Sequence, residues 1–168
     1  MRNPLPSVSE PRVYLLNLVL QFVREAALCP GVMRIALVGS LATLKPIPKD
    51  ADVLVTMEVE TDLAQLARAG RRLKGQAGSA NLGADIFLCD PAGRYFGRVC
   101  GYRECHLRAS CYAIHCGRRQ HLNDDLGEVD LSLDVTLSPP FLLWPRVERR
   151  KPAPEEVERV LLTPLEQG

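Results

Sequence analysis

The chain has 168 residues, of which 46% are hydrophobic and 24% are charged, and its formal net charge is +1. These values are typical of one folded globular domain and exclude disorder, collagen and coiled coil as descriptions of the whole chain. The small net charge also excludes a protein that is basic over its whole surface, although a local basic patch is compatible with it.

A first helix is expected from Ser9, which can cap it, to about Ala27. Apolar residues recur at helical spacing and predict its buried stripe: Leu15, Leu16, Val19, Phe22 and Val23. This apolar stretch is too short to span a bilayer, and Glu10 and Arg24 beside it are unlike a signal peptide. We therefore expect no membrane partner and a cytoplasmic protein, whose cysteines are thiols or metal ligands rather than disulfides.

The next elements alternate between apolar strand patterns and helical patterns. In chain order they are a strand at 34–38, a short helical segment after Gly39, a strand at 50–56, a helix from Thr61 to Gly75 and a strand at 82–88. Prolines 46 and 48 prevent the short helical segment from continuing, because each removes a backbone donor. We expect an α+β fold around a mixed sheet.

The second half of the chain differs in composition. Residues 94–121 are rich in Arg, Cys, His and aromatic residues, whereas 129–137 alternate apolar and polar residues and predict a half-buried edge strand. Residues 141–145 are expected to pack on the core, and the charged end, with a short helix near 155–162, is expected to be peripheral. The expected division is a core at 1–93, a Cys/His-rich basic segment with a strand at 94–145, and a charged tail at 146–168.

Carboxylates on the predicted strands are the candidate catalytic residues. Asp50 and Asp52 lie two apart on one strand, so both side chains project from the same face. Two such carboxylates repel unless a cation lies between them, and hard oxygen ligands favour Mg²⁺ or Mn²⁺. Gly39 follows a strand, where backbone N–H groups and the Ser40 hydroxyl can bind a phosphate. Asp85 joins the cluster if the third strand neighbours the second, and the set then suits phosphoryl or nucleotidyl transfer.

The alternative reading gives these residues only structural roles. Asp50 would cap a turn, Asp52 and Asp85 would face solvent, and Gly39 would only end a strand. This reading accounts poorly for Asp52 and Asp85, which lie inside otherwise apolar strands.

The segments Leu37-Val38-Gly39-Ser40, Asp50-Ala51-Asp52-Val53 and Ala84-Asp85-Ile86, in this order, resemble the polymerase-β-like nucleotidyltransferase superfamily, especially its small minimal members. The resemblance covers roughly residues 10–90 and implies that family's fold. It implies that Gly39 and Ser40 bind the triphosphate of an NTP and that Asp50 and Asp52 bind both metal ions. Asp85 would bind the second ion or help to deprotonate the attacking hydroxyl.

The reaction implied by this resemblance transfers a nucleoside monophosphate to a hydroxyl or phosphate of an unidentified acceptor, which is RNA, protein or a small molecule. Pyrophosphate would leave. Minimal members often have Ala-Arg-Gly after the Gly-Ser-x, whereas Thr43 and Leu44 follow Ala42 here. Lys45 or Lys49 would then supply the positive charge for triphosphate binding.

This departure supports a second hypothesis, a non-catalytic module of the same fold that binds nucleic acid or a partner protein. A third hypothesis is an antitoxin-like protein that modifies or sequesters a toxin partner, and it rests on size alone.

The basic segment also holds a candidate zinc site. Its four thiols are the expected structural ligands, because tetrahedral Zn²⁺ binds thiolates well: Cys100, Cys105, Cys111 and Cys116. Buried free thiols are the alternative, since no Cys-x-x-Cys pair is present. Cys29 and Cys89 are expected to be core thiols. The arginines and aromatics of the segment would bind an RNA acceptor, form a solvated face, or balance zinc-bound thiolates and the acidic run at 124–134.

Overall fold

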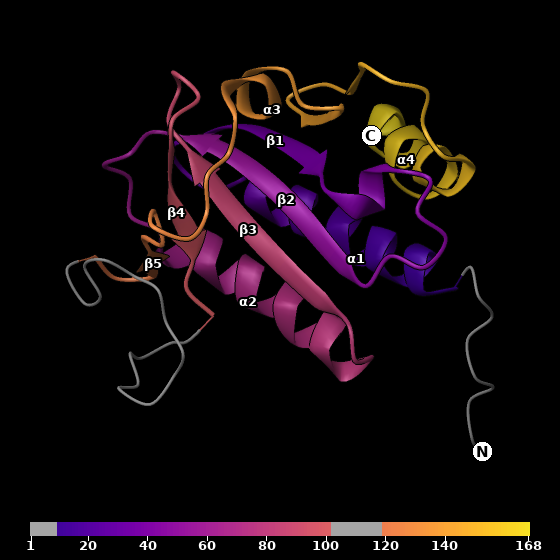
Figure 1. The fold of residues 1–168 in the computed structure, drawn as a ribbon, viewed down its shortest axis with the longest axis horizontal. Helices are drawn as coiled ribbons and strands as arrows, with labels where there is room; N and C mark the ends of the chain where they lie inside the picture. Colours follow the sequence, from indigo (N-terminus) through magenta and orange to yellow (C-terminus); the bar gives the residue numbers. More distant parts are fainter. Residues whose placement is uncertain (1–9, 102–118) are drawn as a thin grey trace.

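The computed structural model of the chain describes residues 10–101 and 119–168 (Figure 1). In these residues one mixed sheet of seven strands has the order β5-β4-β3-β2-β1-β6-β7. The strands are β1 (Val32–Val38), β2 (Asp50–Met57), β3 (Gly83–Cys89), β4 (Tyr95–Val99), β5 (Leu122–Asn123), β6 (Phe141–Trp144) and β7 (Glu148–Arg149). β2 and β3 run parallel, and the other neighbouring pairs are antiparallel. The expected α+β class with a mixed sheet is confirmed.

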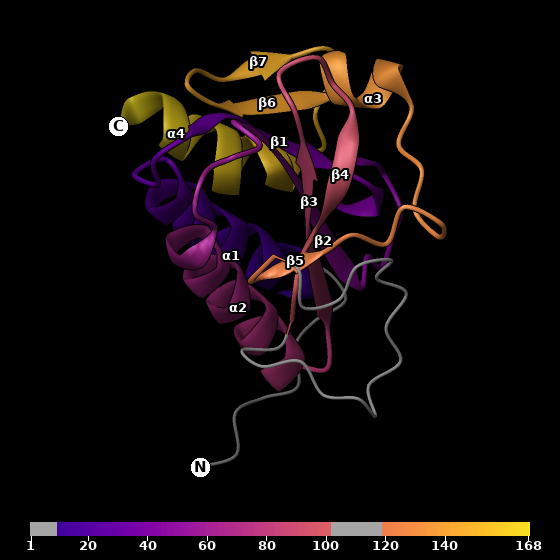
Figure 2. The ribbon, with the colours of Figure 1, turned by 90° about the vertical axis from the view of Figure 1, so that its left-hand side faces the viewer.

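Helices cover one face of this sheet. They are α1 (Glu10–Ala26), α2 (Ala64–Ser79), η2 (Val157–Leu162) and α4 (Thr163–Gln167). Figure 2 shows α1 and α2 side by side under the sheet. α2 is the crossover that a parallel β2–β3 pair requires, because a tight turn cannot connect parallel strands. The strand residues that face the helices are fully buried, as at Val53, Val55 and Leu37.

Most of the expected elements are present, with small shifts at their ends. Gly39 is followed by η1 (Ser40–Ala42), as expected. α2 does not end at Gly75 as predicted but continues to Ser79. A glycine inside a helix costs only about 1 kcal/mol, and the fully buried Ala77 anchors the last turn in the core.

The predicted strand at 129–137 is wrong. This segment contains the short helix α3 (Leu133–Leu137), where the Ser132 side chain accepts a hydrogen bond from the Val135 N–H and caps the helix. Its alternating apolar residues are not buried as one stripe, because Leu133 and Leu137 are exposed. The edge of β1 that such a strand could have joined is already paired with β6.

The expectation that the C-terminal segment is peripheral is also wrong. η2 buries Val157, Leu161 and Leu162 completely in the main core beside α1. In contrast, the expected packing of 141–145 on the core is confirmed, since Phe141 in β6 is fully buried. This segment therefore combines charged residues with a helix, η2, whose buried side chains complete the core.

Candidate active site

The parallel pairing of β2 with β3 brings the three candidate carboxylates together. In this register Asp52 lies directly opposite Asp85, and Asp50 lies two residues before Asp52 on the same strand. Their neighbours Ala51 and Ala84 are buried in the helix-covered core, so the carboxylates project from the opposite face. The expectation that the third strand neighbours the second is thus confirmed, and the side chains it unites lie on the face free of α1 and α2.

Gly39 lies at the end of β1, immediately beside this cluster. Val38 pairs with Asp52, and Gly39 has a φ of 72°, which side-chain-bearing residues rarely adopt. A Cβ on Gly39 would lie 2.3 Å from Asp52 Oδ2. Both observations require glycine here, and they show how closely the chain at this turn approaches the carboxylate.

Arg12 of α1 holds the loop that follows Gly39 by hydrogen bonds, and sequence reasoning missed this residue. Its side chain is buried, its Nη1 donates to the Leu41 carbonyl at 2.9 Å, and its Nη2 donates to the Lys45 carbonyl. The Thr43 hydroxyl adds a hydrogen bond to the Ser40 carbonyl at 2.7 Å. A guanidinium thus reaches this loop from α1, although the loop itself contains no arginine. The sequence shows Arg12 only as a charged residue at the start of an apolar helical stretch, and this does not identify the loop that it contacts.

The other two predicted nucleotide-binding residues lie in the loop between η1 and β2. Lys45 and Lys49 are both exposed there. The Lys49 carbonyl accepts a hydrogen bond from the Gly83 N–H at 2.8 Å, which ties the end of this loop to the start of β3. Both lysines therefore belong to the segment that connects the Gly39 turn to β2.

Burial and like charge act on Asp52. Burial, and then the neighbouring carboxylates of Asp85 and Asp50, raise the pKa of Asp52 to about 6, while Arg98 lowers it. A cation at this position would stabilise the ionised form of Asp52, because it would offset the charges of Asp85 and Asp50. Asp50 and Asp52 are the residues that could hold a hard divalent cation here.

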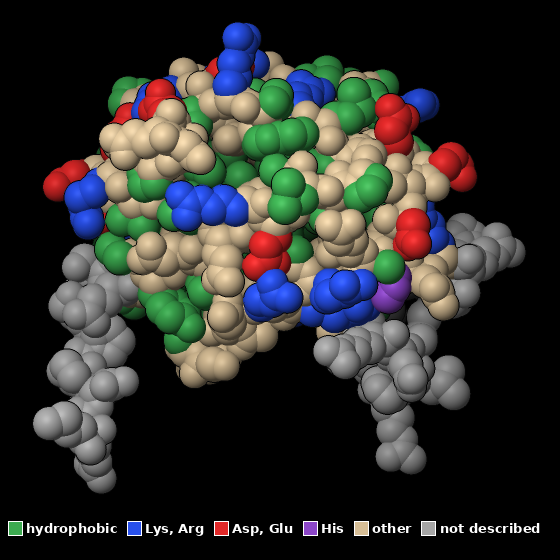
Figure 3. All heavy atoms as spheres, turned by 180° about the vertical axis from the view of Figure 1, so that it is seen from behind, with side chains coloured by type: hydrophobic (Ala, Val, Ile, Leu, Met, Phe, Trp, Pro, Cys, Tyr) green, Lys and Arg blue, Asp and Glu red, His purple; other side chains and the backbone are tan. Residues whose placement is uncertain are grey.

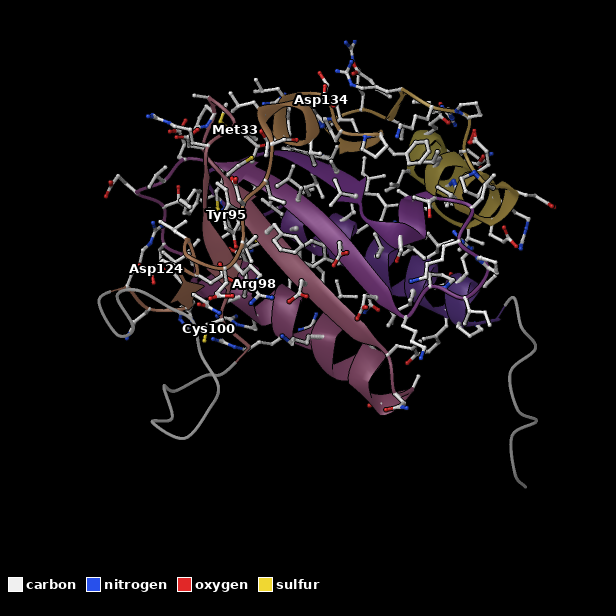
Figure 4. The ribbon with its side chains drawn as sticks, in the orientation of Figure 1. Met33, Tyr95, Arg98, Cys100, Asp124 and Asp134 are labelled. Carbon is white, nitrogen blue, oxygen red and sulfur yellow. The ribbon has the colours of Figure 1, made fainter. Side chains whose placement is uncertain are left out.

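Arg98 of β4 forms an ion-pair network that the sequence did not predict. Its Nη1 lies 3.0 Å from Asp85 Oδ1, and its Nε lies 2.6 Å from Asp125 Oδ2. The fully buried Asp125 also accepts a hydrogen bond from the Tyr95 hydroxyl at 2.5 Å. Figure 4 shows Tyr95 and Arg98 close to each other in the structure. For Arg98 the predicted balance against the acidic run at 124–134 is confirmed.

A second cation also lies close to Asp85. Lys74 Nζ is 3.8 Å from Asp85 Oδ1, so this carboxylate faces two basic side chains. In the described part of the chain, no group of three or more His, Cys, Asp or Glu side chains is arranged to hold a metal ion. Of the three candidate carboxylates, Asp50 and Asp52 form no ion pair with another described residue, and Mg²⁺ commonly binds through one or two carboxylates together with substrate phosphates.

The zinc ligands predicted from the cysteines fall mostly outside the described residues. Cys105, Cys111 and Cys116 lie outside them, and Cys100 is half-buried just after β4. The predicted core thiols are confirmed, because Cys29 and Cys89 are both buried. Burial is the main cause that raises the pKa of each of these thiols.

Basic side chains also gather on the other side of the molecule. Arg71 Nη2 lies 2.9 Å from His121 Nδ1, and Figure 3 shows Lys and Arg side chains beside the histidine at the lower edge of that face. Arg119 stacks over the Phe96 ring at 5.7 Å and donates to the Thr61 carbonyl at 2.8 Å. Burial, and then the nearby Arg71, lower the pKa of His121.

No helix in residues 10–101 or 119–168 has the length and apolar character needed to cross a membrane. The scan against protein-family models matches no family, and the searches of curated proteins and of solved structures match no protein. The function of the site is therefore inferred from its own chemistry.

Proposed function

We propose that this protein is a metal-dependent nucleotidyltransferase, which transfers a nucleoside monophosphate from an NTP to a hydroxyl or phosphate of an acceptor. The observation that carries the proposal is the meeting of Gly39, Asp52 and Asp85 on one sheet face, with Asp52 opposite Asp85 and in van der Waals reach of the Gly39 turn. Asp52 is buried beside two other carboxylates at an electrostatic cost, which supports a site where a bound cation offsets that cost.

The residues divide into a cation-binding pair and a phosphate-binding loop. Asp50 and Asp52 would hold Mg²⁺ or Mn²⁺, which when bound would neutralise charge on the transferred phosphoryl group. The turn at Gly39 would let the triphosphate approach the backbone closely, with the Ser40 hydroxyl as a further donor. Lys45 and Lys49 would attract the polyanion to this loop.

Asp85 would act beside the acceptor. Arg98 holds its carboxylate from the β4 side at 3.0 Å. From this position Asp85 would accept a proton from the attacking hydroxyl or complete the second metal site, as the resemblance implies.

The experiment that tests the proposal is label transfer. Each α-phosphate-labelled NTP is incubated with Mg²⁺ or Mn²⁺, the protein and a cell extract, and the labelled products are separated and tested for nuclease and protease sensitivity. Wild type should transfer label, and Asp50→Asn and Asp52→Asn should each abolish transfer. Asp130→Asn, an exposed change of the same kind, should retain it.

Label that persists undiminished in Asp52→Asn would refute the assignment, as would folded wild type that transfers no label from any NTP. The products would also identify the acceptor class: RNA, a protein such as a toxin partner, or a small molecule.

The pairing of Asp85 with Arg98 and Lys74 favours a second candidate, a non-catalytic module of the same fold that binds nucleic acid or a partner protein. The basic group around Arg71, His121 and Arg119 would bind phosphates and stack bases, with Phe96 beside Arg119. This candidate predicts RNA or DNA binding that weakens with salt and survives Asp52→Asn. Wild type that binds no RNA or DNA at low salt would exclude its nucleic-acid form.

A further inference from the structure

A groove of about 590 Å³ opens beside the Gly39 turn. Its volume falls within the roughly 300–1,000 Å³ typical of small-molecule sites. Its walls are mainly apolar and come from three parts of the chain: Ala42 and Leu44 after β1, Val135 of α3 with Pro140 before β6, and Pro154 before η2. Lys151 adds a cation to the lining.

The groove and the carboxylates meet at Gly39. This residue lines the groove, and its α-carbon is so close to Asp52 that an added Cβ would lie 2.3 Å from Oδ2. A phosphate bound at this turn would therefore have the cation-binding pair on one side and the groove on the other. On the side of Asp52 that faces away from the groove lies Asp85, which is paired with Arg98.

The lining fits a nucleoside attached to a phosphate chain. Among the described residues that line the groove, Lys151 is charged and none is a carboxylate, which complements a polyanion. Its apolar walls suit a flat base, and Leu44 at its edge is 83% exposed, so a bound base would remove apolar surface from water.

We propose that this groove binds the nucleoside moiety of the NTP, with Val135 and Pro140 against the base and Lys151 beside the ribose or the phosphates. The proposal rests on the proposed function. It also assigns the two sides of the site: the donor nucleotide lies on the Val135 side of Gly39, and the acceptor approaches from the Asp85 side.

Binding measurements on the full chain test this assignment without relying on transfer. Calorimetry with Mg²⁺ compares each of the four NTPs with inorganic tripolyphosphate, for wild type and for two matched pairs of variants. Val135→Trp fills the groove, whereas Leu133→Trp places the same side chain at an exposed position of the same helix. Lys151→Glu reverses the charge of a lining residue, whereas Arg150→Glu makes the same change at the exposed neighbour outside the lining.

Wild type should bind at least one NTP about tenfold more tightly than tripolyphosphate, because the nucleoside adds apolar contact. Val135→Trp should weaken NTP binding by about tenfold or more and leave tripolyphosphate binding within about twofold of wild type. Lys151→Glu should weaken NTP binding by several-fold, and both control variants should bind like wild type.

The proposal is overturned if Val135→Trp and Lys151→Glu, both folded, bind every NTP like wild type. It is also overturned if wild type binds tripolyphosphate as tightly as every NTP, or binds no NTP. A dimer that sedimentation velocity detects in wild type and not in Val135→Trp would assign the groove to a second copy instead. Groove-dependent NTP binding without label transfer would uphold the groove and refute the transfer reaction, so the two proposals fail separately.

Discussion

A single residue, Gly39, sets how closely the chain approaches the carboxylates. Its φ of 72° and the contact of its Cβ position with Asp52 Oδ2 both act against any larger residue. A residue that only ends a strand needs neither a positive φ nor such a close approach to a side chain. Gly39 has both.

We expect Gly39→Ala to lower the free energy of unfolding by about 1–3 kcal/mol through backbone strain and the clash with Asp52. It should also abolish NTP binding, because the turn must move. Gly75→Ala is the control, since nothing lies within 4 Å of its Cβ position in the helix interior, and it should raise stability by about 0.5–1 kcal/mol. Urea denaturation of both variants measures the effect, and equal stability of Gly39→Ala and wild type would contradict it.

Asp52 makes stability depend on pH with a definite sign. Its pKa is raised from 3.8 to about 6, so the folded protein binds this proton at pH values where the unfolded chain has lost it. The stabilisation is fully present below the unfolded value and is lost as the pH rises through about 6.

In EDTA, the urea midpoint of wild type should therefore fall relative to that of Asp52→Asn when the pH is raised from about 4.5 to about 7.5. Cation binding should show the opposite trend and strengthen as the pH rises through about 6, because the proton competes for the same oxygens. A difference in midpoint between the two proteins that is the same at both pH values would show that Asp52 titrates normally.

At the scale of elements, the network around Arg98 joins β3 and β4 to the loop at Asp125. Neither the register of β4 nor the return of residues 122–125 to its edge is visible in the sequence. The pairing of β3 with β4 contains a register shift between Leu88 and Cys89, and Gly97 has a φ of 143°. With this irregularity, Tyr95 and Arg98, which are three residues apart on β4, both reach Asp125. The desolvation of Asp125 is compensated by these two partners together.

Asp125→Asn should lower the free energy of unfolding by about 2–4 kcal/mol, because it leaves the Arg98 charge with one partner fewer in a partly buried place. The expected loss of stability is smaller than for a fully buried ion pair, because the Arg98 side chain is 25% exposed. Asp130→Asn, at an exposed position of the same segment, should change stability by less than about 0.5 kcal/mol. Similar denaturation curves for both variants would contradict a structural role for the network.

At the scale of the whole molecule, the two ends of the described chain meet in one core. η2 places fully buried side chains beside α1, so the segment with the charged sequence closes the helical layer. The residues of η2 therefore contribute to global stability.

Leu161→Ala should lower the free energy of unfolding by about 2–5 kcal/mol, because Leu161 is fully buried and its removal leaves a cavity. Leu133→Ala, at a side chain that is 55% exposed, should have an effect below about 1 kcal/mol. A Leu161→Ala protein as stable as the Leu133→Ala protein would show that the C-terminal helix is dispensable.

Periodicity predicted α1, β1, β2, α2 and β3, because each has a buried face large enough to impose its own pattern on the sequence. The pattern failed at 129–137, where five alternating apolar residues suggested a strand. Capping by Ser132 and the bond from Thr136 Oγ1 to the Gly93 carbonyl at 2.7 Å favour a helix instead. The bond to Gly93 joins residues 43 positions apart, so the alternation of apolar and polar residues could not predict it.

The sequence by itself determined which carboxylates lie on apolar strands and that Gly39 precedes them, since side-chain alternation and turn chemistry are local properties. Only the tertiary structure decided that Asp52 lies opposite Asp85, that Arg12 supports the loop after Gly39, and that Arg98 pairs with Asp85. It also decided that a groove begins at Gly39. The physical reason is that strand register and ion pairing depend on which segments become neighbours, and packing of the whole chain selects those neighbours.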